Sequence, residues 1–232
     1  MLPAAIPPAN PKCPICNGVM FGPGPKGRMA PNGTLPRCVE CQSLERHRIF
    51  RVMFEKLGTE NFANWSAIQF SPDATVDPSW FGSHELSVYG EPSGLDIQSI
   101  DRPDAAYDIV LCSHVIEHVG NDRGALLELL RITKPEGMLY LAFPDPFRED
   151  VTRDWGFPKP EKHGHWRVYG GDVVKRFAAY IPDQPVLAYR GEDPVTGEWE
   201  GAFLLPRSPE RYRWITSRLG SGVSLYSGPY IS

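Results

Sequence analysis

Four cysteines near the start of the chain are the residues whose spacing points most directly to chemistry. Cys13 and Cys16 form one C-x-x-C pair, and Cys38 and Cys41 form a second. Each pair can direct two thiolates at one point, and four thiolates complete the tetrahedral coordination of Zn²⁺. Disulfides or a redox-active C-x-x-C are the alternatives, but neither accounts for two copies. We therefore predict a small ribbon with a structural Zn²⁺ site.

Two groups of histidines supply candidate acids, bases and ligands. His114, Glu117 and His118 have the spacing H-x-x-E-H, which on a helix would place all three on one face. This pattern favours a structural or acid–base role over a second metal site. His163 and His165 flank a glycine and precede Trp, Arg and Tyr residues, a mixture suited to polar ligands. We predict His165, His163 or His114 as a general base.

Three other features carry charge or reactivity. Arg167 is a candidate clamp for a carboxylate or phosphate group. A basic cluster is expected on the solvated face of a helix, with a phosphate contact as the alternative; it consists of Arg46, His47, Arg48 and Arg51. Cys112 lies alone in an apolar run and is expected to be buried and inert.

Short apolar runs that alternate with turns and helices predict the elements that position these residues. Strands are predicted at 67–71, 85–89, 94–97, 107–112, 138–143, 185–189 and 201–205. Helices are predicted from Ser43 to a stop at Gly58, and at 121–133, 172–180 and 210–218, with 163–171 as a loop. Continuous apolar strands are typical of sheets covered on both faces, so we predict an α/β fold with a Rossmann-like, doubly wound sheet.

Candidate ligand-binding residues lie at the ends of four of the predicted strands. They are Ser71, Pro72 and Asp73 after the first, Glu91 after the second, Asp96 and Ile97 at the end of the third, and Ser113 and His114 after the fourth. Ligands of such sheets bind at the carboxyl ends of the strands. Carboxylates there suit a ligand with a ribose diol and an adenine amino group.

One stretch of sequence resembles a known family. Residues 107–119 (YDIVLCSHVIEHV) and 121–144 (NDRGALLELLRITKPEGMLYLAFP) are similar to the fourth strand, a helix and the fifth strand of class I S-adenosylmethionine-dependent methyltransferases, of the type 11-like kind. The resemblance covers residues 67–206. The C-x-x-C pairs together with the stretch SLERHR at 43–48 resemble a zinc-bearing bacterial subgroup.

The resemblance implies specific roles for the residues at the strand ends. S-adenosylmethionine would be the cofactor, with Asp96 and Ile97 at the adenine and Glu91 at the ribose. The backbone of residues 71–73, which comprises Ser71, Pro72 and Asp73, would hold the methionine moiety. Ser113 and His114 would lie beside the sulfonium.

Length and composition limit the remaining possibilities. The chain has 232 residues, a net charge of −4 and no apolar run long enough to span a membrane, so we expect a soluble, cytoplasmic protein without a membrane partner. An acidic chain lacks the basic field typical of proteins that bind nucleic acid nonspecifically. We predict an arm and zinc ribbon at 1–42, a methyltransferase domain at 43–206 and a C-terminal tail at 207–232.

The leading hypothesis is O-methylation of a small polar or carbohydrate-like acceptor, with S-adenosylmethionine as cofactor and a structural zinc site. An RNA-modifying methyltransferase that grips phosphates with the basic cluster is one alternative. The other is a noncatalytic binding or scaffold protein, because the first loop, at 68–74, lacks the glycines usual in the family. Short connections around the second and third strands also predict that one or more of the usual helices are reduced or absent.

Overall fold

The computed structural model describes residues 10–227, and the chain separates into two compact units. The N-terminal unit contains residues up to 59 together with 73–77 and 190–200. The sheet unit contains 60–72, 78–189 and the remainder from 201. The boundaries predicted at 42/43 and 206/207 stay predictions.

The N-terminal unit combines a two-stranded antiparallel hairpin with one helix. Strands β1 (Phe21–Gly22) and β2 (Arg37–Cys38) form the hairpin, and α1 spans Glu45–Leu57 and is followed by Gly58. The helix predicted after Ser43 is therefore confirmed. Its apolar residues recur on one face and are all buried: Ile49, Phe50, Met53, Phe54 and Leu57.

The basic cluster of α1 does not form the solvated face that we expected. Arg48 is completely buried, with its guanidinium donating to both carboxylate oxygens of Asp193 at 2.8 and 2.6 Å and to the carbonyls of Pro36 and Ser43. Arg51 is also largely buried. A buried guanidinium needs such partners to offset its desolvation. These two arginines therefore serve the fold of this unit.

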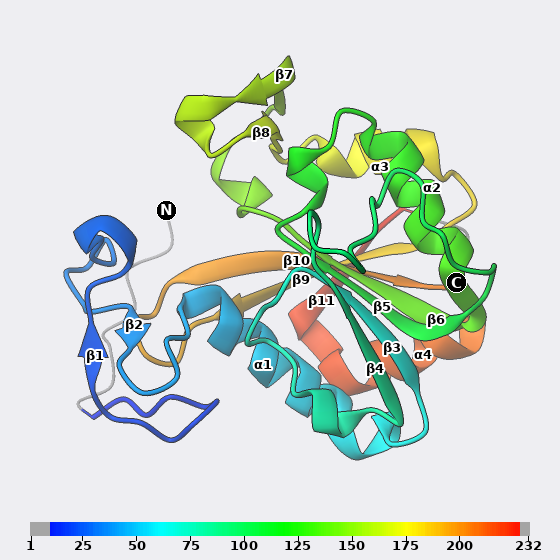
Figure 1. Cartoon of the computed structure of the whole chain (residues 1–232). Helices are drawn as coiled ribbons and strands as arrows, with labels where there is room; N and C mark the ends of the chain where they lie inside the picture. Colours follow the sequence, from blue (N-terminus) through cyan, green and yellow to red (C-terminus); the bar gives the residue numbers. More distant parts are fainter. Residues whose placement is uncertain (1–9, 228–232) are drawn as a thin grey trace. The chain divides into compact units, whose positions relative to one another are not determined.

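A mixed seven-stranded sheet lies in the second unit, except for residues 190–192 and 199–200 of two of its strands (Figure 1). Strands β3, β4, β5 and β6 are mutually parallel, whereas β10 pairs antiparallel with β6 and β11 with β9. Cys112, in β5, is completely buried, as predicted. Across the sheet the strands are β11 (Val223–Ser227), β9 (Val186–Glu192), β10 (Trp199–Pro206), β6 (Thr133–Ala142), β5 (Tyr107–Ser113), β3 (Ser66–Phe70) and β4 (Ser83–Ser87).

Helices cover both faces of this sheet (Figure 1). One face carries α2 (Asp122–Ile132) and α3 (Val173–Tyr180), which share a core with β3, β5 and β6. The other face carries α4 (Pro209–Leu219), with Ile215 buried. The doubly wound fold and these three helices are confirmed. No helix within the described residues is long and apolar enough to cross a membrane.

Two local predictions differ from the structure, and one strand was not predicted. The strand predicted at 94–97 does not form, and only an isolated bridge joins Asp96 to Ser99. The Asp96 carboxylate accepts the backbone N–H of Gln98 at 2.8 Å, and such a local bond competes with strand pairing. The predicted loop at 163–171 contains β8 (His165–Val168), which pairs with β7 (Arg153–Lys159) as a separate hairpin. Residues 223–227 of the predicted tail form β11.

The reduced connections predicted around the second strand are confirmed. Between β3 and β4 the structure contains only one 3₁₀ turn, Pro78–Trp80, in place of a helix. The segment from β4 to β5 also lacks a helix in this described part of the chain. The carboxyl ends of β3 and β4 are therefore followed by loops in place of α-helices.

Candidate active site

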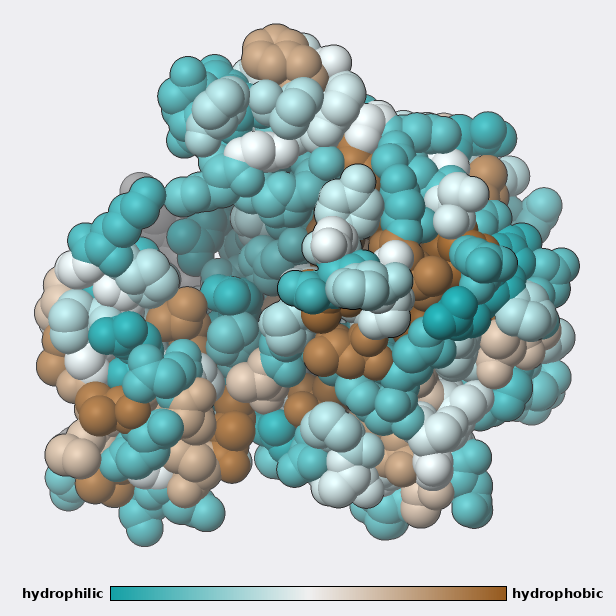
Figure 2. Space-filling view, viewed as in Figure 1, coloured by the Kyte–Doolittle hydropathy of each residue, from teal (hydrophilic) through white to brown (hydrophobic). Residues whose placement is uncertain are grey.

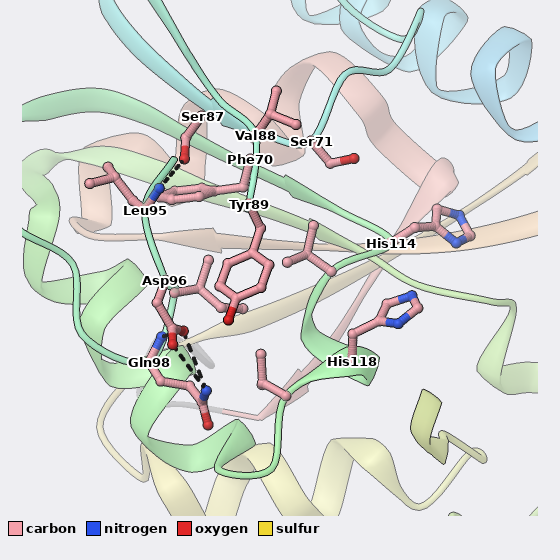
Figure 3. Close-up of a pocket in the computed structure, with 13 residues that line it drawn as sticks. Phe70, Ser71, Ser87, Val88, Tyr89, Leu95, Asp96, Gln98, His114 and His118 are labelled. Carbon is pink, nitrogen blue, oxygen red and sulfur yellow. Dashed lines mark hydrogen bonds between the residues drawn. The ribbon is translucent and has the colours of Figure 1, made fainter. Parts of the chain in front are cut away.

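A cavity of about 420 Å³ lies at the carboxyl ends of β3, β4 and β5 in the sheet unit (Figure 3). Because helices and loops cover a parallel sheet elsewhere, this edge is where such folds bind ligands. Its lining is mainly apolar, with a few polar groups at its two ends. The lining residues are Phe70, Ser71, Ser87, Val88, Tyr89, Leu95, Asp96, Ile97, Gln98, His114, Val115, His118 and Val119.

The structure gathers half of the predicted cofactor residues at this cavity. Those that line it are Ser71, Asp96, Ile97 and His114. Those of the same unit that are not among its lining residues are Pro72, Glu91 and Ser113. Asp73 belongs to the N-terminal unit, where its carboxylate lies 3.8 Å from Nε2 of His47. The roles assigned to these residues stay predictions.

One end of the cavity is organised around Asp96. Figure 3 shows Asp96 and Gln98 on one side, with Tyr89 between them and the two histidines. The Ser87 hydroxyl accepts the backbone N–H of Leu95 at 2.9 Å, which fixes the loop that carries Asp96. Asp96 is the only acid among the lining residues. Its carboxylate is therefore the acceptor available to ligand hydroxyl or amino groups.

The glycine-free loop after β3 is held in a conformation that usually needs glycine. Ser71 has a φ of +71°, in the left-handed region. Its N–H donates to the carbonyl of Ser87 at 2.9 Å, and its carbonyl accepts from the Gln69 side chain at 3.0 Å. These bonds offset the strain at a non-glycine residue. The loop after β3 thus makes, without a glycine, a sharp turn of the kind that usually contains one.

Histidines occupy the opposite end of the cavity. His114 follows β5 with a φ of +54°, and Ile116–His118 form a 3₁₀ turn, not an α-helix. Glu117 therefore points inward and is 1% exposed, whereas His118 is exposed and lines the cavity. The shared face that an α-helix would give His114, Glu117 and His118 is therefore not formed.

The hairpin of β7 and β8 brings further imidazoles to this end. The rings of His118 and His165 meet edge to face, with centroids 4.5 Å apart, and those of His163 and His165 are 6.3 Å apart. Burial lowers the pKa of His165, the Glu117 carboxylate opposes that shift, and the neighbouring histidines lower the pKa further. The His165 imidazole is therefore neutral at pH 7 and able to accept a proton.

Arg167 is not the ligand clamp that we expected. Its side chain is 2% exposed, and it donates to the Asp154 carboxylate at 2.8 Å. It also donates to the carbonyls of Val119 at 2.6 Å and Gly120 at 2.9 Å. Every one of these bonds is internal, so Arg167 fixes the turn at 116–120 to the hairpin that carries His165.

The four N-terminal cysteines converge in the N-terminal unit. Their sulfur atoms all lie within 4.8 Å of one another, with Cys13 to Cys41 at 3.6 Å and Cys16 to Cys38 at 3.5 Å. Sulfur atoms bound to one Zn²⁺ in a tetrahedron lie about 3.8 Å apart. The residue after each pair has a positive φ, +62° at Asn17 and +61° at Gln42, so the two turns match. This cluster fits a Zn²⁺ ion.

Several lining residues were not predicted from the sequence. Tyr89, Gln98 and His118 line the cavity, and Tyr89 is 77% exposed. The signal for Tyr89 and Gln98 was their position beside predicted strand ends. His118 was considered only as part of the H-x-x-E-H pattern, because its proximity to His165 depends on the β7–β8 hairpin.

The family described as a methyltransferase domain matches residues 51–178, more than half of the chain. The chain belongs to this methyltransferase family. The match includes every residue that lines the cavity. The sheet has the Rossmann-like fold of class I S-adenosylmethionine-dependent methyltransferases, so the resemblance seen in the sequence is confirmed. No curated protein matches this methyltransferase at a significant level.

Solved structures with similar folds share little sequence with this methyltransferase. A methyltransferase of Thermotoga maritima, described as a possible histamine N-methyltransferase, is 12% identical with a TM-score of 0.44, covering 70% of this chain and 91% of that one. The 1,6-didemethyltoxoflavin-N1-methyltransferase of Burkholderia thailandensis is 11% identical with a TM-score of 0.44, covering 70% and 78%. A methyltransferase of Aquifex aeolicus is 13% identical with a TM-score of 0.40, covering 68% and 89%.

Proposed function

We propose that the cavity binds S-adenosylmethionine and that the protein transfers its methyl group to a hydroxyl of a small polar or sugar-like acceptor. The observation that carries this proposal is a family-matched cavity with a carboxylate at one end and imidazoles at the other. Asp96 would accept hydrogen bonds from the nucleoside, as its place at the strand ends suggests. The sulfonium would then lie toward His114.

The transfer itself moves one methyl group between two atoms. The bond from sulfur to the methyl carbon breaks as the bond from the acceptor oxygen to that carbon forms, and the sulfonium becomes a neutral thioether. In-line placement of the three atoms supplies much of the rate. The acceptor hydroxyl loses its proton to a base, which can contribute about 10²–10⁴-fold.

The base would come from the group formed by His114, His163 and His165. His114 lines the cavity, while His163 and His165 lie on the adjacent hairpin. A neutral imidazole accepts the proton and returns it to solvent after the transfer. His114 is our first choice because it lies closest in the chain to the carboxyl end of β5.

A small polar acceptor suits the surface beside the histidines. In Figure 2 the surface over the β7–β8 hairpin is predominantly hydrophilic or neutral. The RNA alternative loses support because Arg48 and Arg51 of the basic cluster are buried. An RNA acceptor would need exposed Arg or Lys side chains to bind its phosphates.

We propose that Cys13, Cys16, Cys38 and Cys41 hold a structural Zn²⁺. The fit of the sulfur separations to tetrahedral geometry supports this assignment. The ion would supply folding energy to a unit with few apolar residues in its hairpin. Cysteines outside disulfides are typical of a reducing compartment, so we also propose a cytoplasmic location.

Calorimetric titration with S-adenosylmethionine and its demethylated product tests the cofactor proposal. We expect both ligands to bind the wild type with micromolar affinity. Asp96→Ala should weaken binding at least tenfold, because it removes the only lining carboxylate. Asp101→Ala, an exposed acid outside the cavity, is the matched control and should bind like the wild type. Absence of binding by either ligand would favour the noncatalytic scaffold.

A panel of acceptors tests the second half of the proposal. We would incubate the protein with methyl-labelled S-adenosylmethionine and sugars, phenols, hydroxy acids or RNA, and measure label on each. We expect transfer to small hydroxylated compounds. Label found on RNA alone would replace the small acceptor by the RNA alternative.

A further inference from the structure

Glu117 is a buried carboxylate whose charge no hydrogen bond compensates. Its side chain is 1% exposed, and neither carboxylate oxygen has a hydrogen-bond partner within the described chain. Its ion-pair contact is with Nδ1 of His114 at 3.5 Å, and that ring is charged only when protonated. Burying a carboxylate without a partner is unfavourable, so folded proteins rarely leave one in this state. A cation beside Glu117 would remove this cost.

Two imidazoles complete a set of donors around this carboxylate. One carboxylate oxygen of Glu117 and one ring nitrogen each of His118 and His165 lie within 4.8 Å of one another. Donors that share one ion at about 2.1 Å lie at most about 4.2 Å apart. Small side-chain rotations close that difference, and the exposed His118 ring permits them.

We propose that Glu117, His118 and His165 bind a divalent transition-metal ion. Two imidazoles and one carboxylate are the donor set of catalytic Zn²⁺ sites and of non-haem Fe²⁺ sites. Mg²⁺ and Ca²⁺ prefer oxygen donors, so the two nitrogen donors disfavour them. This site is separate from the four cysteines, which belong to the other unit.

The backbone around the three ligands is held by Arg167. Its guanidinium donates to the carbonyls of Val119 and Gly120 and lies at 3.5 Å from that of Ile116, which fixes the turn that carries Glu117 and His118. The same arginine lies two residues after His165 in β8. One buried side chain therefore sets the distance between ligands that are far apart in the sequence.

The ion would face the acceptor side of the cavity. His118 lines the cavity, and three protein ligands leave coordination positions open for other groups. A hydroxyl bound there would lose its proton more readily and would be held in place for methyl transfer. This role rests on the proposed function, whereas the metal site itself is inferred only from the arrangement of Glu117, His118 and His165. With His165 as a ligand, the role of base falls to His114.

Counting zinc ions per chain tests the site without cofactor or acceptor. Each protein is dialysed against buffered Zn²⁺ and analysed by mass spectrometry of the metal. We expect Glu117→Gln and His165→Ala each to hold one ion fewer than the wild type, with at least tenfold weaker binding of that ion in a chelator titration. Glu161→Gln, an exposed acid on the same hairpin segment, should match the wild type.

Thermal unfolding, measured with and without Zn²⁺, distinguishes loss of the metal site from poor folding of a variant. In chelator, Glu117→Gln should melt no lower than the wild type, because an amide is cheaper to bury than an unpaired carboxylate. Added Zn²⁺ should raise the midpoint of the wild type and of Glu161→Gln more than that of Glu117→Gln. Equal ion counts in the wild type, Glu117→Gln and His165→Ala would overturn the proposal. If the two variants lose the ion but the wild type does not bind S-adenosylmethionine, the metal site is supported and the proposed function is rejected.

Discussion

At the scale of single residues, two positions with strained backbone line the cavity. Ser71 and His114 both have positive φ and both line it, one after β3 and the other after β5. Non-glycine residues in this region cost about 1–3 kcal/mol each and persist only where the surroundings fix them. Because the two positions follow neighbouring parallel strands, the strain lies where the proposed ligand would contact backbone.

His114 allows a test of the proposed base. We expect His114→Ala to lower kcat by about 10²–10⁴-fold, because the acceptor hydroxyl would lose its proton acceptor. The affinity for S-adenosylmethionine should change far less, since Asp96 lies at the other end of the cavity. Kinetics with an acceptor from the labelled panel, combined with calorimetry, separates the two effects.

His84→Ala is the matched control for that experiment. His84 lies in β4 outside the cavity lining, and its Nε2 contacts the Gln69 side chain at 3.0 Å. We expect turnover close to that of the wild type. An unchanged kcat in His114→Ala would remove His114 from the mechanism and return the role of base to His163, because His165 is a ligand of the proposed metal site.

The role of a residue could be predicted from the sequence when its contacts come from nearby in the chain, and not when they come from distant segments. His114 was found because the end of β5 can be read from its apolar run, whereas Asp96 was predicted from a strand that does not form; both residues line the cavity. Arg167 was misjudged because a buried guanidinium and a ligand clamp look the same in sequence. The contact between His118 and His165 depends on the β7–β8 hairpin, which no periodic pattern in the sequence predicted.

At the scale of elements, the β7–β8 hairpin is tied to the turn at 116–120 by one buried guanidinium. We expect Arg167→Ala to lower the free energy of unfolding by about 2–4 kcal/mol, because three backbone carbonyls and Asp154 lose a charged donor. Denaturant unfolding measures this change. Exposed Arg153, paired with Glu149 at 2.7 Å, is the control, and Arg153→Ala should cost about 0–1 kcal/mol. Equal losses would mean that Arg167 does not anchor the hairpin.

Strands β3 and β5 are joined at their start by a carboxylate whose ionisation stabilises the sheet. The Asp108 side chain accepts from the Ser66 N–H and from Lys134 Nζ, both at 2.8 Å. Burial alone would raise the pKa of Asp108, but the bonds from Lys134 and Ser66 outweigh it and lower the pKa. A lowered pKa in the folded state stabilises the fold above the unfolded value, about 3.9, and this stabilisation is lost as the pH falls.

Asp108→Asn should therefore be less stable than the wild type near pH 7. The difference should stay constant down to about pH 5 and shrink below about pH 4, as Asp108 becomes protonated in the wild type. Urea unfolding at several pH values gives both curves. A difference that did not depend on pH would show that the Asp108 charge contributes nothing.

Elements with strong periodic patterns were predicted from the sequence, and those set by local polar bonds were not. The apolar run of β5 and the capped helix α2 match the structure within one or two residues, and the Asn121 side chain accepts the Gly124 N–H at 2.9 Å as an N-cap. The run at 94–97 looked equally strand-like. There the Ser87 hydroxyl accepts the Leu95 N–H and the Asp96 carboxylate accepts the Gln98 N–H, so the segment forms a turn and not a strand.

At the scale of the whole molecule, the two units rely on different sources of stability. The sheet unit buries a continuous apolar core that joins β3, β5, β6, α2 and α3. In the N-terminal unit the hairpin contributes two-residue strands, and its apolar residues Val19 and Met20 are exposed. Such a segment needs a crosslink or a metal to hold its turns.

Removing zinc should therefore loosen one unit selectively. We expect Cys16→Ser, or a strong chelator, to increase hydrogen exchange sharply in residues 13–41 while β5 and β6 remain protected, because the apolar core of the sheet contains no metal ligand from this set. Hydrogen exchange followed by mass spectrometry resolves the two regions. Cys112→Ala is the control, since Cys112 is fully buried in β5 and distant in sequence from the four ligands; it should keep its N-terminal protection and its zinc. If the 13–41 segment keeps its protection without zinc, the bonds of the two turns hold the ribbon on their own, and the four cysteines are not a structural metal site.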